Sequence, residues 1–177
     1  FKRNKNLQFI EANIIVVENA VVALQKIAAH HRRKFDIPVI GITGSNGKTI
    51  VKEWLYHILR SQFNIIRSPK SYNSQVGVPL SILQMNKHHT LAIFEAGISL
   101  PGEMKALEVM IMPTLGLLTN IGTAHLENFE SKNALINEKR TLFKNCQYIH
   151  IDDKDEFADI HIEKQGNHSK ISTNWKG

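Results

Sequence analysis

The stretch GSNGKT, residues 44–49, has the residue types and spacing of a loop that binds phosphate. It lies between the apolar run PVIGIT and a segment whose apolar residues recur at helical spacing. Backbone N–H groups at such a junction point toward a bound anion, and the helix dipole adds positive charge there. Lys48 would reach the β- and γ-phosphates of a nucleotide, and the Thr49 hydroxyl would bind Mg²⁺. The predicted nucleotide-binding residues are Gly44, Ser45, Asn46, Gly47, Lys48 and Thr49.

The match to the general phosphate-loop pattern, G-x-x-x-x-G-K-[ST], is imperfect. Its first glycine would fall at Ile42, and Gly41 lies one residue too early. The alternative is a strand–helix turn that carries a surface lysine. The predicted strand-to-helix context favours the phosphate loop.

Further polar side chains follow other apolar runs. Glu95 ends the run LAIFE, and the carboxyl ends of parallel strands are where doubly wound proteins bind ligands. A carboxylate near a triphosphate is suited to Mg²⁺, although a solvated acid at a strand end is the alternative.

Asn120 and His125 follow the run LGLLT and would lie on the same edge. A neutral imidazole can bind a metal or a phosphate oxygen, but a lone histidine among nine is usually incidental.

Lys139 lies on the apolar stripe of a predicted helix, where Leu135, Lys139 and Leu142 share a face. The ordinary interpretation is a lysine that extends its charged end into water. If it is buried, burial favours the neutral amine, which can react with CO₂ to form an anionic carbamate.

Short apolar runs alternate with helical patterns along the chain, which predicts a doubly wound α/β fold with a mostly parallel sheet. The runs are continuous, as in strands buried on both faces. They are PVIGIT (38–43), FNIIR (63–67), LAIFE (91–95), LGLLT (115–119) and YIHI (148–151). Helices are expected over TIVKEWLYHILRS, over the segment between Pro101 and Pro113, and from about Ser131 to Asn145. An earlier helix would place Val21, Leu24, Ile27 and Ala28 on one face.

Composition narrows the function classes. The chain has 177 residues and a net charge of +6, which suits a nucleotide or a nucleic acid as partner. Nucleic-acid binding is disfavoured, because the basic residues are scattered and few aromatics accompany them. A single cysteine, Cys146, cannot form an internal disulfide, so a cytoplasmic protein is expected. No apolar run is long enough to span a bilayer, so membrane insertion is not expected.

These motifs together resemble those of the Mur ligases. TGSNGKT resembles their ATP loop, which folylpolyglutamate synthetase shares, and EAGISLPGE, TNIGTAHL and KRTLF resemble later Mur blocks. The block SYNSQVGVP resembles one that is characteristic of the D-alanyl-D-alanine-adding Mur ligases. Two departures stand out: Ser71 replaces an asparagine, and Ser99-Leu100 stands where many relatives have Asn-His.

The resemblance implies a role for each matching residue. ATP and two Mg²⁺ ions are the expected cofactors, with Thr49 and Glu95 at the first metal. His125 and a carbamylated Lys139 would serve the second metal, and with Lys48 they would be the catalytic residues. Asn120 would help to bind the nucleotide, and Asn73, from the SYNSQVGVP block, would contact the substrate.

The implied reaction joins an acid to an amine at the expense of ATP. The carboxylate of a UDP-N-acetylmuramoyl tripeptide would form an acyl phosphate, and the amine of D-alanyl-D-alanine would then displace phosphate, giving a peptidoglycan precursor. One alternative is another amide ligase of the superfamily, such as folylpolyglutamate synthetase. The other is a nucleotide-binding regulatory module without ligase chemistry.

Mur ligases have three domains, and the expected assignment follows from that. Residues 1–36 would be the tail of the UDP-substrate domain and a linker, and residues 37–177 an incomplete central ATP-binding domain. The C-terminal ligase domain would be absent, so the chain alone should not catalyse ligation. The segments IVKEWL, RSPKSYNSQ and IFEAGIS resemble the corresponding sequences of Bacteroidetes ligases, which are often fused to an alanine racemase.

Overall fold

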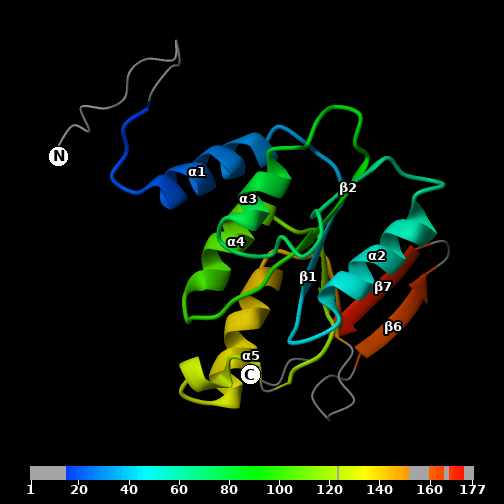
Figure 1. Ribbon diagram of the computed structural model, residues 1–177. Coiled ribbons are helices and arrows are strands. Elements are labelled where there is room, and N and C mark those ends of the chain that lie inside the picture. Colours follow the sequence, from blue (N-terminus) through cyan, green and yellow to red (C-terminus); the bar gives the residue numbers. More distant parts are fainter. Residues whose placement is uncertain (1–14, 123, 152–159, 166–167, 174–177) are drawn as a thin grey trace.

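The computed structural model describes residues 15–122, 124–151, 160–165 and 168–173. A five-stranded parallel sheet forms its centre, with strand order β2-β3-β1-β4-β5 (Figure 1). The strands are β1 Val39–Thr43, β2 Ile65–Arg67, β3 Leu91–Glu95, β4 Leu115–Leu118 and β5 Tyr148–Ile151. All five predicted strands are present, and the parallel α/β fold is confirmed.

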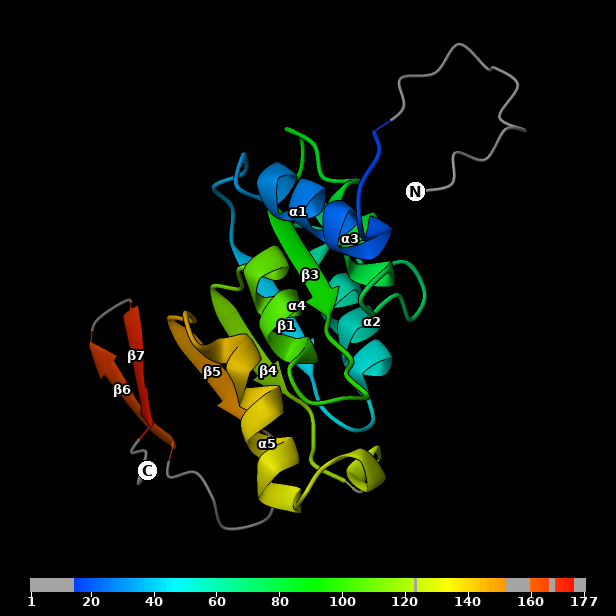
Figure 2. The same cartoon turned by 90° about the vertical axis from the view of Figure 1, so that its left-hand side faces the viewer.

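Helices cover both faces of the sheet, so the doubly wound arrangement is confirmed. The helices are α1 Ala20–Arg32, α2 Lys48–Leu59, α3 Gly77–Ile82, α4 Glu103–Ile111 and α5 Lys132–Arg140, with short 3₁₀ turns η1 Leu126–Asn128 and η2 Thr141–Phe143. Helix α2 packs on one face around Ile42, Leu91 and Ile93. Helices α1, α3, α4 and α5 lie over the other face (Figure 2). The larger core there takes side chains from these helices and from η2.

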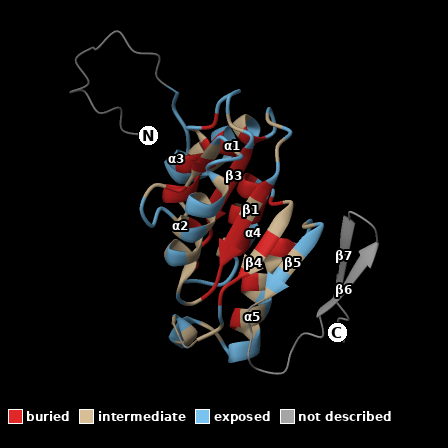
Figure 3. Cartoon of the chain, turned by 90° about the vertical axis from the view of Figure 1, so that its right-hand side faces the viewer, coloured by how far each residue is buried: buried red, intermediate tan, exposed pale blue. Residues whose placement is uncertain are grey.

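Burial differs between the centre and the edge of the sheet. Every residue of β3 is buried, as the continuous apolar run predicts (Figure 3). Strand β5, at the edge, alternates exposed and half-buried residues, so the expectation that YIHI is buried on both faces is wrong. An edge strand has a neighbour on one side only, and its side chains keep more contact with water.

The apolar stripe expected on α2 is only partly buried. Val51, Leu55 and Leu59 pack against the smaller core. Ile50, Trp54 and Ile58, which belong to the same helical spacing, are exposed. They occupy every fourth position and form a separate row on the solvent side of the helix.

Helix α1 packs against α3 and α4. Ala28, which the sequence placed on its inner face, is fully buried, whereas Ile27 is half exposed. Ala29 and the charged Arg32 complete the buried face instead. The Arg32 guanidinium donates to the carbonyl oxygens of Phe35, Ile111 and Met112, and so fastens α1 to the C-terminal end of α4.

Two features of the C-terminal part were not predicted: the early end of the helix expected from about Ser131 to Asn145, and a hairpin after β5. Ser131 caps α5 by accepting from the backbone N–H of Ala134, but the α-helix ends at Arg140 and continues only as a 3₁₀ turn. Strands β6 Ile160–Gln165 and β7 His168–Thr173 form an antiparallel hairpin that the sequence did not predict. Among the described residues, no helix is long and apolar enough to cross a membrane.

Candidate functional site

The predicted phosphate loop joins the carboxyl end of β1 to the N-terminus of α2. Gly44 and Gly47 take positive φ angles of 144° and 82°, a conformation that only glycine adopts without strain. A Cβ atom on Gly44 would lie 2.0 Å from the hydroxyl oxygen of Thr119. Gly47 is the N-cap of α2, so the helix starts at Lys48 with its first N–H groups directed out of the helix. The loop therefore has the backbone form that the phosphate-loop prediction requires.

Residues after β4 brace this loop. Asn120 accepts from the N–H groups of Ser45, through its backbone carbonyl, and of Asn46, through its side-chain oxygen, both at 2.9 Å. Thr119 donates its hydroxyl to the carbonyl of Asn46 at 2.6 Å. Asn120 thus occupies two loop N–H groups, which leaves the N–H groups at the start of α2 to face an anion. The role of Asn120 in nucleotide binding stays a prediction.

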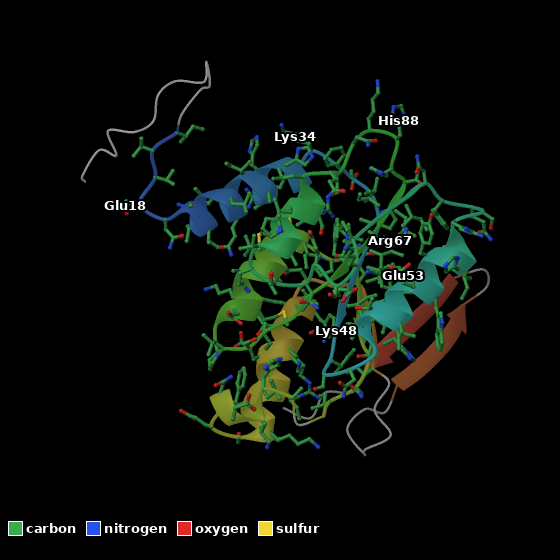
Figure 4. The ribbon with its side chains drawn as sticks, viewed as in Figure 1. Glu18, Lys34, Lys48, Glu53, Arg67 and His88 are labelled. Carbon is green, nitrogen blue, oxygen red and sulfur yellow. The ribbon has the colours of Figure 1, made fainter. Side chains whose placement is uncertain are left out.

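Lys48 lies at the first position of α2 (Figure 4). Its Nζ donates to the carbonyl of Gly44 at 2.8 Å and to that of Ser45 at 3.3 Å, so the side chain folds back over the loop. Burial lowers the pKa of Lys48, and the nearby Glu95 carboxylate partly opposes this. A cation held by neutral carbonyl oxygens beside free helical N–H groups is suited to a phosphate.

Glu95 ends β3 with its side chain fully buried. The strand pleat places it on the same face as Leu91 and Ile93, which is the face that α2 covers. Its Oε2 accepts from the Thr49 hydroxyl at 3.0 Å and from the Asn73 side-chain amide at 3.5 Å. The structure therefore brings the two residues of the predicted first metal site into contact.

Lys52 was missed by the sequence analysis. Its side chain is fully buried, and its Nζ lies 2.8 Å from Oε1 of Glu95 and 3.2 Å from Oε1 of Glu53. One signal was available: Lys52 follows the loop residue Lys48 by four positions, the spacing that places two residues on one face once the helix includes both. The sequence did not show that a buried carboxylate would lie opposite that face. Glu53 also pairs with Arg67, at 3.1 Å, near the surface (Figure 4).

A cavity of about 320 Å³ lies beside the loop. Lys48, Asn73, His125 and Lys139 all contribute to its lining, so the structure brings these predicted site residues together. His125 has a φ of 65°, in the left-handed region, where it precedes η1. Both polar and apolar side chains line the cavity, and it reaches the phosphate loop at Gly44, Ser45 and Lys48.

Lys139 is buried, with 2% of its surface exposed, although it lines this cavity. Burial, helped by the positive charge of Lys48, lowers its pKa from 10.5 to about 8. The alternative of a lysine that extends into water is therefore wrong. About one molecule in ten would carry the neutral amine at pH 7, far more than for an exposed lysine.

The outer wall of the cavity comes from the segment after β2. The backbone N–H of Gly97 donates to the Asn73 carbonyl at 2.8 Å, which ties this segment to the end of β3. Gln75 donates to the carbonyl of Glu103 at 3.1 Å and accepts from Gln25 of α1 at 2.9 Å. These two glutamines could not be predicted from the sequence, because nothing in their spacing links α1 to this segment.

The residues at the loop suit Mg²⁺ when phosphate oxygens share the ion. The Glu95 carboxylate is buried, with its Oε1 2.8 Å from the Lys52 ammonium and its Oε2 beside the Thr49 hydroxyl, which adds a second oxygen. Across the described residues, no three His, Cys, Asp or Glu side chains come together as a metal cluster. Mg²⁺ commonly binds one or two protein oxygens and completes its shell with water and substrate phosphates. The chemistry here fits that arrangement rather than a closed cage.

Comparisons with known proteins agree with this geometry. Residues 42–176 match the family described as the Mur ligase middle domain. The chain is 40% identical over 124 residues to a UDP-N-acetylmuramoyl-tripeptide--D-alanyl-D-alanine ligase of Synechocystis sp., covering 70% of this chain and 27% of that protein. It is 34% identical over 152 residues to the Borreliella burgdorferi ligase of the same name, covering 85% and 32%.

A solved structure shows the same fold. The chain superimposes on the MurF ligase of Thermotoga maritima, solved in complex with ADP, with a TM-score of 0.72 and 24% identity. The match covers 94% of this chain and 47% of that one. The chain therefore spans about a third of the curated relatives and about half of the solved structure. The family match extends over most of the chain, and it agrees with the glycine loop after β1 and with the contact between Thr49 and Glu95. The chain belongs to the Mur ligase family.

Proposed function

We propose that this chain is the ATP-binding part of a ligase that adds D-alanyl-D-alanine to a UDP-N-acetylmuramoyl tripeptide. The observation that carries the proposal is the convergence of Lys48, Thr49 and Glu95 at the carboxyl edge of the sheet. The names of the two sequence relatives support the choice of substrates. Because the chain covers only part of each relative, the activity is proposed for a longer protein that contains it.

ATP would lie with its phosphates on the loop. The N–H groups at the start of α2 and the Lys48 ammonium would hold the terminal phosphates. A ligase of the same fold holds ADP, which supports a nucleotide as the ligand. The cavity beside Lys48 and Asn73 would receive the carboxylate end of the tripeptide.

The proposed reaction has two steps. A carboxylate oxygen of the tripeptide attacks the γ-phosphorus of ATP, and ADP leaves with the electron pair of the broken bond. The amine of D-alanyl-D-alanine then attacks the acyl carbon, loses a proton, and inorganic phosphate leaves. Lys48 and the loop N–H groups would act mainly by positioning the phosphates and neutralising their charge.

Two Mg²⁺ ions would supply further charge neutralisation when bound. Thr49 and Glu95 would hold the first, and His125 and Lys139 the second. Lys139 would need to become a carbamate to serve as a ligand, and its lowered pKa supports that, because the neutral amine is the form that reacts with CO₂. The second ion and the carbamate remain proposals.

We propose the domain division that the sequence suggested, with residues 1–36 as the tail of a preceding UDP-substrate domain and a linker, and residues 37–177 as an incomplete central ATP-binding domain. Helix α1 packs on α3 and α4, so in this division the segment that precedes residue 37 would contact the ATP-binding core. A cytoplasmic setting, where ATP is available, fits the proposed reaction.

The test is phosphate release by a longer protein that contains this chain, with ATP and Mg²⁺. The tripeptide nucleotide would be supplied with and without D-alanyl-D-alanine, and a folate with glutamate would run in parallel. Release that requires both peptide substrates would support the proposal. Release with the folate pair alone would indicate a folylpolyglutamate synthetase. Tight ATP binding without release in either set would indicate a nucleotide-binding regulatory module.

A further inference from the structure

Lys52 is a buried ammonium group that connects three parts of the site. Its Nζ lies 2.8 Å from Oε1 of Glu95 at the end of β3. It also donates to the carbonyl oxygens of Ser68, at 2.8 Å, and Lys70 in the segment that follows β2. Because a buried charge is costly unless it is paired and hydrogen-bonded, these partners fix the Lys52 side chain in one position.

Glu95 has two lysines within electrostatic reach, and the structure pairs it with only one. Lys52 lies against its Oε1, whereas Lys48 feels its charge but donates to the carbonyls of Gly44 and Ser45. A neutral carbonyl is a weaker partner for an ammonium than a carboxylate. A phosphate oxygen can therefore displace the present partners of Lys48 more readily than it could displace Glu95.

We propose that Lys52 is a positioning residue that holds the Glu95 carboxylate away from Lys48, so that the Lys48 ammonium stays available for a phosphate. The inference rests on the nucleotide site of the proposed function. With Lys52 present, Glu95 has a buried cation on one oxygen and the Thr49 hydroxyl on the other. Without Lys52 the buried carboxylate would lack its cation, and Lys48, on the same helix face, would take its place.

The test is binding of ADP to this 177-residue chain in the presence of EDTA, measured by calorimetry. Metal-free conditions isolate the lysines from Mg²⁺. Lys52→Met should weaken ADP binding about tenfold or more, because Lys48 becomes paired with Glu95. Adding Glu95→Gln to Lys52→Met should return the affinity to within about twofold of wild type, because no carboxylate is left to capture Lys48.

Recovery of ADP affinity in the double variant would show that Glu95 captures the Lys48 ammonium when Lys52 is absent. Because Glu95→Gln also removes the uncompensated buried charge, the melting temperature of each variant is measured alongside ADP affinity. A loss of affinity in a Lys52→Met chain that is fully folded at the assay temperature cannot come from unfolding. Arg32→Met is the matched control: it also removes a buried cation that binds carbonyl groups, but at the far end of α4. It should lower the melting temperature and leave ADP affinity unchanged.

Each outcome has a definite meaning. If Lys52→Met binds ADP as wild type does, or if the double variant stays as weak as the single one, the inference is wrong. If Lys52→Met does not fold, Lys52→Gln, which keeps a donor for the Ser68 carbonyl, replaces it with the same expected loss. If the folded wild-type chain does not bind ADP at all, the nucleotide site of the proposed function fails, and this inference with it.

Discussion

At the scale of single residues, Lys139 shows how burial sets chemical behaviour. It lies in a helix of the larger core, beside the positive Lys48, and its pKa of about 8 is far below that of an exposed lysine. The sequence placed it correctly on an apolar face. It could not show that the side chain ends inside the protein, because that depends on how α5 packs against the loop.

Replacing Lys139 with methionine should stabilise the chain near pH 7, by up to about 3 kcal/mol, because a buried ammonium without a carboxylate is unfavourable. The folded-state pKa lies below the unfolded one, so between pH 8 and 10.5 the unfolded chain binds more protons. Wild-type stability therefore rises with pH across that window, and the advantage of the variant shrinks.

Urea unfolding of both proteins from pH 7 to 10.5 measures this difference. Lys144→Met, at an exposed position, should show no such pH-dependent advantage. An advantage for Lys139→Met that stays constant across the window would mean that Lys139 is not the group whose pKa is lowered.

Gly44 gives a second prediction at this scale. Gly44→Ala would place a methyl group 2.0 Å from the Thr119 hydroxyl oxygen at a positive φ, so the loop must move. We expect ADP binding to fall below detection and the unfolding free energy to drop by more than about 1 kcal/mol. Gly102→Ala is the control, since Gly102 also has a positive φ but has no atom within 4 Å of the added carbon. It should cost only the backbone strain, and equal effects of the two substitutions would contradict the role of the clash.

At the scale of elements, the sequence predicted which segments are helices better than which faces they bury. Apolar residues of α2 recur at helical spacing, but Ile50, Trp54 and Ile58 are exposed and Lys52 is buried. Apolar residues at spacings of three and four fill more of the helix surface than one side of a sheet can cover. Only the docking angle of α2 decides which half faces inward, and that angle depends on the whole sheet.

Arg32 sets the attachment of α1 and gives a prediction for this element. Arg32→Met leaves the carbonyl groups of Phe35, Ile111 and Met112 without their donor, and we expect a loss of about 2–4 kcal/mol in unfolding free energy. Chemical denaturation measures it, with the exposed neighbour Arg33 replaced by methionine as the control. Similar small losses for both variants would show that α1 is held by its apolar contacts alone.

At the scale of the whole molecule, the order of the sheet was not predictable from the sequence. Five strands in chain order give no sign that β1 lies between β3 and β4, yet this order brings Glu95 and Asn120 to the loop. The hairpin of β6 and β7 was also not predicted, because neither IHIEKQ nor HSKIST contains a continuous apolar run. The motif resemblance supplied the site residues that spacing alone left open.

The 177-residue chain should bind nucleotide but should not complete the reaction, because it spans only about a third of the length of its ligase relatives. With ATP, Mg²⁺, the tripeptide nucleotide and D-alanyl-D-alanine, phosphate release should not exceed that of a Lys48→Ala variant. Calorimetry should still detect ADP binding that this variant lacks. Turnover above the variant would show that the 177-residue chain contains all the catalytic groups.

The bracing of the loop by Asn120 has a consequence for the order of events during folding. Asn46 and Asn120 are 74 positions apart, and their hydrogen bond cannot form until β4 has docked beside β1. Closing so long a segment is entropically costly, so contacts of this kind tend to form slowly. In a refolding experiment the recovery of ADP binding should lag behind the recovery of helical circular dichroism, so that the nucleotide reports the last stage of chain assembly.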